Sequence, residues 1–99
     1  MTGVGFHPAA RAELIDAAAY YEARAVGLGA QFVNEAERTV AALAGSPGLG
    51  APVPGHDALR RWPLRRFPYY VLYNVDGAAL LILAVAHERR RPGYWGERS

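Results

Sequence analysis

The sequence predicts an α+β domain in which an N-terminal helical hairpin packs on one face of a three- to four-stranded antiparallel sheet. Apolar residues recur at helical spacing over residues 9–25 and again over about 30–44, which indicates two helices. Two later apolar runs flank the dipeptide Asp76-Gly77, a common loop of tight β-hairpins. Because 99 residues suffice for one hydrophobic core, we expect a single domain over residues 1–99.

Proline and glycine delimit the predicted helices. His7-Pro8 marks the start of the first helix, since proline at the first helical position loses no hydrogen bond. Gly27-Leu28-Gly29 interrupts the helical pattern, and so short a link makes the two helices antiparallel neighbours. Residues 46–55 are rich in proline and glycine, so we expect a loop there.

The register of the predicted β-hairpin separates two faces. With Asp76 and Gly77 as the two loop residues in a type I′ turn, Tyr73 lies opposite Leu80 and Arg66 lies opposite His87. One face would be buried beneath the helices and carries Phe67, Tyr69, Val71, Tyr73, Leu80 and Ile82. The other face would stay partly exposed and carries Tyr70, Leu72, Leu81, Leu83 and Val85. An exposed apolar patch favours a partner surface; the alternative is that Pro92-Gly93-Tyr94-Trp95 folds back over it.

Charge is distributed unevenly along the chain. Residues 1–55 hold three arginines against five carboxylates, residues 56–99 hold eight arginines against four, and lysine is absent. The planar guanidinium suits carboxylates and phosphates. We expect one end of the sheet to form an anion- or target-binding site from Arg65, Arg66, Arg89, Arg90 and Arg91, with His87 and Tyr94 nearby. Histidine, arginine and tyrosine together also suit acid–base cleavage of RNA; the alternative is a solvated rim of arginines paired with carboxylates.

Composition excludes several other classes. Hydrophobic residues make up 52% and charged residues 20% of the chain, as in globular proteins. We expect a cytoplasmic protein without membrane contact, because we find neither a membrane-length apolar run nor an N-terminal signal pattern. There is no cysteine, and the three histidines are dispersed, so we expect no metal and no cofactor.

The order of these motifs resembles the RelE/ParE superfamily of type II toxin–antitoxin toxins, also called plasmid stabilisation proteins. The resemblance covers nearly the whole chain. It is carried by Phe6-His7-Pro8-Ala9-Ala10 with Glu13-Leu14, Tyr20-Tyr21-Glu22, Gly29 with Phe32, Ser46-Pro47-Gly48, Arg60-Arg61, Arg65-Arg66-Phe67-Pro68-Tyr69 with Tyr73, and Ala84-Val85-Ala86-His87 through Arg91-Pro92-Gly93-Tyr94-Trp95.

The resemblance implies a compact toxin with a cognate antitoxin, ParD-like or similar, wrapped around it. On this interpretation the antitoxin contacts lie on the sheet and its arginine rim, at Arg60, Trp62, Arg66, Tyr70, Leu72, Leu81, Leu83 and Val85. ParE-like members of the superfamily inhibit DNA gyrase, whereas RelE-like members cleave mRNA on the ribosome.

The sequence is more similar to the ParE-like branch. The lysines usual in RelE-like members are missing, and Glu88 stands where an arginine is expected; a carboxylate there would repel the phosphate. We therefore predict gyrase inhibition without catalysis of its own. The first alternative is a ribonuclease that uses Arg65, His87, Arg90 and Tyr94, and the second is a non-toxic protein-binding domain.

Overall fold

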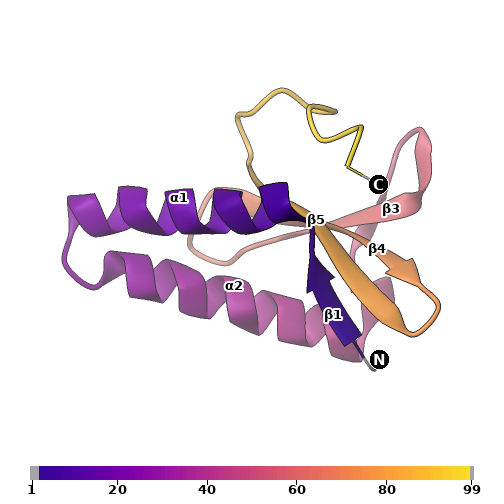
Figure 1. Cartoon of the computed structure of the whole chain (residues 1–99), viewed down its shortest axis with the longest axis horizontal. Coiled ribbons are helices and arrows are strands. Elements are labelled where there is room, and N and C mark those ends of the chain that lie inside the picture. The colour runs from indigo at the N-terminus through magenta and orange to yellow at the C-terminus, as the bar shows by residue number, and fades with distance from the viewer. Residues whose placement is uncertain (1–2, 99) are drawn as a thin grey trace.

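The computed structural model describes residues 3–98 and contains two helices and a five-stranded sheet (Figure 1). The elements run in the order β1 (Gly3–Phe6), α1 (Pro8–Arg24), α2 (Leu28–Gly45), a 3-10 turn η1 (Pro47–Leu49), β2 (Ala51–Val53), β3 (His56–Pro63), β4 (Tyr69–Asp76) and β5 (Ala79–His87). The predicted helical hairpin on one sheet face is confirmed. Within the described range 3–98, neither helix has the length and apolarity needed to cross a membrane.

The helical hairpin is fixed by local side-chain chemistry. The Nδ1 atom of His7 accepts a hydrogen bond from the Ala9 N–H at 3.1 Å, which caps α1. At the other end, the Glu22 carboxylate accepts the N–H groups of Gly27 and Gly29 at 3.0 Å. A Cβ at Gly29 would lie 2.5 Å from the Ala18 carbonyl oxygen, so only glycine lets the two helices approach this closely.

The sheet is larger than predicted and is mixed. Its strand order is β1-β5-β4-β3-β2, with β1 parallel to β5 and the other pairs antiparallel. The expectation of three to four antiparallel strands is therefore wrong. We expected a loop where β2 lies, because Pro52 and Pro54 argue against a strand; an edge strand tolerates proline, since its outer N–H groups need no partner.

The β4–β5 hairpin also departs from the predicted register. Asp76 pairs with Ala79, so the loop is Gly77-Ala78. Gly77 has a φ of +60° and Ala78 does not have a positive φ, which fits a type II′ turn rather than type I′. The pairing then shifts between Leu72 and Tyr73, which leaves Leu83 as the extra residue of a β-bulge.

The bulge decides which β5 side chains face the helices. Phe67, Val71, Tyr73, Leu80 and Ile82 are buried in the helix-facing core, with Tyr69 partly buried against it, as predicted. Val85 joins this core as well, so its predicted place on the other face is wrong. The extra residue reverses the alternation of side chains along the strand, and Tyr69 instead of Arg66 comes to lie opposite His87.

The second sheet face is covered by the end of the chain itself. Residues 91–98, here called the strap, return over the sheet (Figure 1). Trp95 is 5% exposed, and beneath it Tyr70 is 5% and Leu72 0% exposed; all three belong to one buried cluster. The prediction that Tyr70, Leu72 and Leu83 remain exposed is therefore wrong, and the alternative, in which the tail folds back, is confirmed.

Candidate functional site

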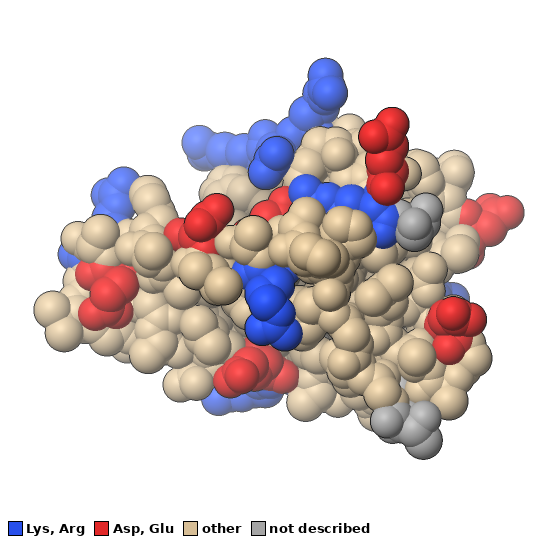
Figure 2. All heavy atoms as spheres, in the orientation of Figure 1, with Lys and Arg blue, Asp and Glu red and all other residues tan. Residues whose placement is uncertain are grey.

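The arginines predicted to converge lie in two separate groups. Arg65 and Arg66 belong to the β3–β4 loop, which leans on α2, whereas Arg89, Arg90 and Arg91 follow β5. In Figure 2 basic side chains gather over the upper part of the molecule, near the segment that follows β5. Arg66 is directed toward Gln31 on α2 and Arg90 toward Glu13 on α1, and the actual register places Tyr69 rather than Arg66 beside His87.

The first group surrounds a buried carboxylate on α2. Glu35 is 6% exposed and accepts the Arg65 backbone N–H at 3.1 Å, while Arg38 Nη1 lies 3.7 Å from its other oxygen. Arg66 donates to Gln31 Oε1 at 2.9 Å and adopts a φ of +71°, a region that costs an L-residue about 1 kcal/mol or more. These side chains line a hollow of about 560 Å³. Sequence reasoning missed Glu35, because its role depends on a loop thirty residues away.

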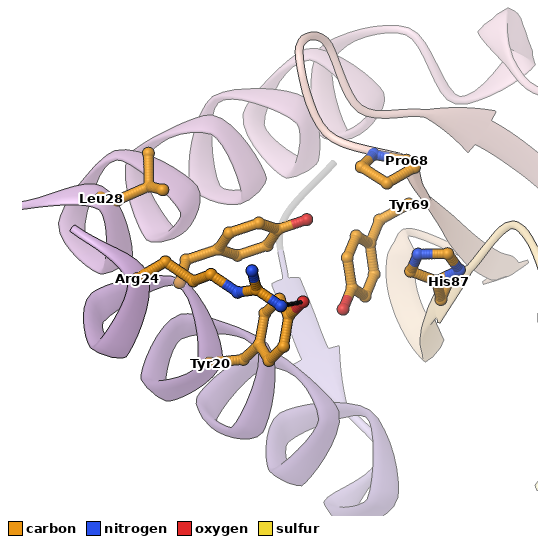
Figure 3. Close-up of a pocket in the computed structure, with 7 residues that line it drawn as sticks. Tyr20, Arg24, Leu28, Pro68, Tyr69 and His87 are labelled. Carbon is orange, nitrogen blue, oxygen red and sulfur yellow. Dashed lines mark hydrogen bonds between the residues drawn. The ribbon is translucent and has the colours of Figure 1, made fainter.

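An aromatic hollow lies between the last turns of α1, the first residue of α2, the start of β4 and the end of β5 (Figure 3). Its volume is about 510 Å³, and Tyr20 from α1, Tyr69 from β4 and His87 from β5 point toward it. Tyr69 and His87 meet edge to face at 5.0 Å, and the Arg24 guanidinium lies 4.7 Å from the centre of the Tyr20 ring. Burial raises the pKa of Tyr69, which further favours the neutral phenol.

Glu13 on α1 organises the adjoining hollow of about 250 Å³. Its carboxylate accepts the Val85 N–H at 3.0 Å, the Tyr94 hydroxyl at 2.8 Å and Arg98 Nη1 at 2.8 Å. Arg90 Nη1 lies 3.6 Å away. Burial, followed by the hydrogen bond to Glu13 and the charge of Glu13, raises the pKa of Tyr94. Sequence reasoning missed this role of Glu13, because its partners lie more than seventy residues away along the chain.

This geometry bears on the candidate ribonuclease residues. His87, Arg90 and Tyr94 line the same hollow, but Arg65 lines hollows beside α2. The Tyr94 proton is held by a carboxylate and its pKa is raised, which makes the phenol a weaker acid than an ordinary tyrosine. The Nδ1 atom of His87 accepts the Arg89 N–H at 3.0 Å. These contacts tie the Tyr94 hydroxyl to Glu13 and the His87 ring to the backbone of Arg89.

Comparison with known proteins assigns the family. The model of the ParE toxin of type II toxin–antitoxin systems, parDE, matches residues 4–92. The chain belongs to the ParE toxin family. A solved chain from the chromosomal ParDE toxin–antitoxin system of P. aeruginosa has a TM-score of 0.70 with this ParE-family chain at 23% identity. The match covers 88% of this chain and 96% of that one, which shows a common fold. A search of curated protein sequences finds no match.

In this ParE-family chain the residues expected to bind an antitoxin do not form one exposed patch. Tyr70, Leu72 and Leu83 lie beneath the strap, and Leu81 is partly buried beside them. Val85 belongs to the helix-facing core instead, and Trp62 is partly buried against that core. Arg60 donates to the Gly50 carbonyl at 2.6 Å. The sequence pattern offered both an exposed patch and a tail folded over it, and only the tertiary contacts of the strap decide for the tail.

Proposed function

We propose that this ParE-family toxin inhibits DNA gyrase and is neutralised by a cognate antitoxin that binds it directly. The observation that carries the proposal is the family match over residues 4–92. The state of Tyr94 supports a toxin without RNA-cleaving chemistry, since its hydroxyl proton is committed to Glu13. The dispersed positions of Arg65 and His87 support the same conclusion.

The antitoxin half of the proposal has separate support. The structural match is to a chain of a ParDE toxin–antitoxin system, and the fold here offers three hollows bordered by both arginine and tyrosine among the described residues. Tyrosine and arginine are the side chains most often found at the energetic centres of protein interfaces. An antitoxin segment with carboxylates and apolar groups would complement these hollows, and its charge would speed association.

Expression of the chain alone, with its neighbouring small reading frame, or with an empty vector tests both halves. We expect growth arrest with DNA breaks when the chain is alone, and rescue when the neighbouring product is present. Purified chain should inhibit supercoiling by gyrase. Two variants distinguish gyrase inhibition from RNA cleavage. Tyr94→Phe removes the phenol, whereas the control Glu97→Gln leaves Tyr94 and Glu13 in place. Growth arrest with mRNA cleavage that Tyr94→Phe abolishes and Glu97→Gln preserves would refute gyrase as the target.

A further inference from the structure

The strap is attached to the sheet by side chains and not by backbone. Among residues 3–98, the backbone N–H groups of Tyr94, Gly96 and Arg98 bond to carbonyls within the strap itself, at Arg91, Gly93 and Trp95. None of the strap's backbone hydrogen bonds in that range reaches the sheet. A segment with this form of attachment can leave without breaking the sheet's own hydrogen-bond ladder.

The side-chain attachments fall at two points. Trp95 lies over the sheet, with its indole N–H donating to the Tyr70 hydroxyl at 3.2 Å. Tyr94 and Arg98 both bond to the Glu13 carboxylate, and Arg98 Nη1 also reaches the Leu83 carbonyl at 3.2 Å. One aromatic anchor and one carboxylate therefore hold the strap in place.

The strap covers two chemically different surfaces, an apolar sheet face and the Glu13 carboxylate. The sheet face is apolar and almost wholly buried, with Leu72 and Leu83 at 0% and 1% exposure, and uncovering it would create an apolar surface of the kind that binds proteins. Glu13 is also largely buried, since its side chain is 14% exposed. It stays near the sheet through the Val85 N–H. Of its two arginine partners, Arg98 at 2.8 Å belongs to the strap, and only the more exposed Arg90, at 3.6 Å, would remain. Loss of the closer cation is costly for a largely buried carboxylate.

Open space lies on both sides of the strap. A hollow of about 590 Å³ separates it from the β2–β3 hairpin and is lined by Val53, Pro54, His56, Arg61, Pro92 and Trp95. The Glu13 hollow lies on the other side, where Arg90 Cζ sits 3.8 Å from the centre of the Tyr94 ring. A competing segment can therefore reach both attachment points from solvent.

We propose that the strap is a displaceable cover, and that the antitoxin binds by replacing it with a segment that presents an aromatic side chain to Tyr70 and an arginine or lysine to Glu13. The chemistry of the replacement follows from charge complementarity with Glu13 and from the apolar face. This inference rests on the proposed function for the identity of the partner, but not for the mobility of the strap.

The decisive measurement follows Trp95 in the full chain. The sequence has two tryptophans, so 5-fluorotryptophan labelling gives two ¹⁹F resonances, and a Trp62→Phe variant assigns them. In the free chain we expect the Trp95 resonance to be insensitive to exchange of H₂O for D₂O. Addition of the unlabelled small protein encoded by the neighbouring reading frame should make it sensitive, while the Trp62 resonance serves as an internal reference. If the Trp95 resonance stays insensitive to D₂O in the complex, displacement of the strap is refuted, whereas neutralisation of the toxin by its antitoxin is not.

A second arm works without the antitoxin. A synthetic peptide with the sequence of residues 91–98 is titrated onto the full chain carrying Trp95→Ala, whose own strap has lost its anchor and whose fold is checked by circular dichroism. We expect binding that weakens at least tenfold for a peptide with Arg98→Ala, and that difference should vanish on a chain that also carries Glu13→Gln. If the neighbouring product does not bind, the antitoxin claim fails and this arm alone decides the strap. Absence of peptide binding to a folded chain then overturns it.

Discussion

Removal of one hydroxyl should loosen the connection between α2 and the sheet. Tyr73 on β4 is fully buried, and its hydroxyl accepts the Gly50 N–H at 2.9 Å and donates to the Pro47 carbonyl. Tyr73→Phe removes both hydrogen bonds without leaving a large cavity. Each such bond contributes about 1 kcal/mol net, and a buried N–H left without a partner costs about 1–3 kcal/mol. We expect the free energy of unfolding to fall by about 2–4 kcal/mol.

Urea unfolding followed by circular dichroism measures this loss. For a chain of this size the slope is of order 1–1.5 kcal/mol per molar urea, so the midpoint should drop by about 2 M. Tyr20→Phe is the matched control, because Tyr20 is half exposed and its hydroxyl meets only the exposed Arg24; that change should stay within about 0.5 kcal/mol. A Tyr73→Phe loss no larger than the Tyr20→Phe loss would refute the idea that this phenol fixes residues 47–50.

Four further predictions concern other parts of the molecule. Gly50→Ala should destabilise by more than about 2 kcal/mol in urea unfolding, since its Cβ would lie 2.5 Å from the Tyr73 oxygen and overpacking is costly; a neutral result would contradict this close approach. Arg66→Gly should be neutral or stabilising by up to about 1 kcal/mol, because glycine accepts the φ of +71°; Arg65→Gly, at a position without a positive φ, serves as its comparison and should be destabilising. Glu35→Ala should cost about 1–3 kcal/mol by leaving the Arg65 N–H unpaired, with Glu35→Gln milder. Finally, burial and Glu13 raise the pKa of Tyr94 in the folded chain above its unfolded value. The stability that the neutral phenol contributes is therefore fully present below the unfolded pKa of about 10 and is lost as pH rises from there through the folded pKa. In an alkaline titration of tyrosinate absorbance, Tyr94→Phe should remove a component that ionises at higher pH than an ordinary tyrosine.

Local chemistry made much of the fold predictable. His7-Pro8 and the glycines around Leu28 mark the ends of the helices by backbone geometry alone, and the structure has α1 begin at Pro8 and α2 at Leu28. Alternation along residues 67–73 correctly separated the residues beneath the helices from those on the other face. Such signals act over a few residues, so they can be read without knowledge of the remaining chain.

The candidate site was harder to predict from local sequence signals. Glu13 and Glu35 each take their roles from partners far along the chain, Tyr94 and Arg65 among them. Neither carboxylate belongs to a local motif, and the polar stripe of a helix does not reveal which acid will be covered. The strain at Arg66 likewise arises from how its loop leans on α2.

By itself the sequence determined a helical hairpin, an apolar antiparallel β-hairpin, an arginine-rich second half and the order of motifs that identifies the family. Only the tertiary structure decided that β1 and β2 complete the sheet, that a bulge at Leu83 turns Val85 inward, and that the strap covers the second face. The reason is physical: helix ends and turns depend on neighbouring residues, whereas strand pairing, bulges and the packing of a terminal segment depend on which distant surfaces meet.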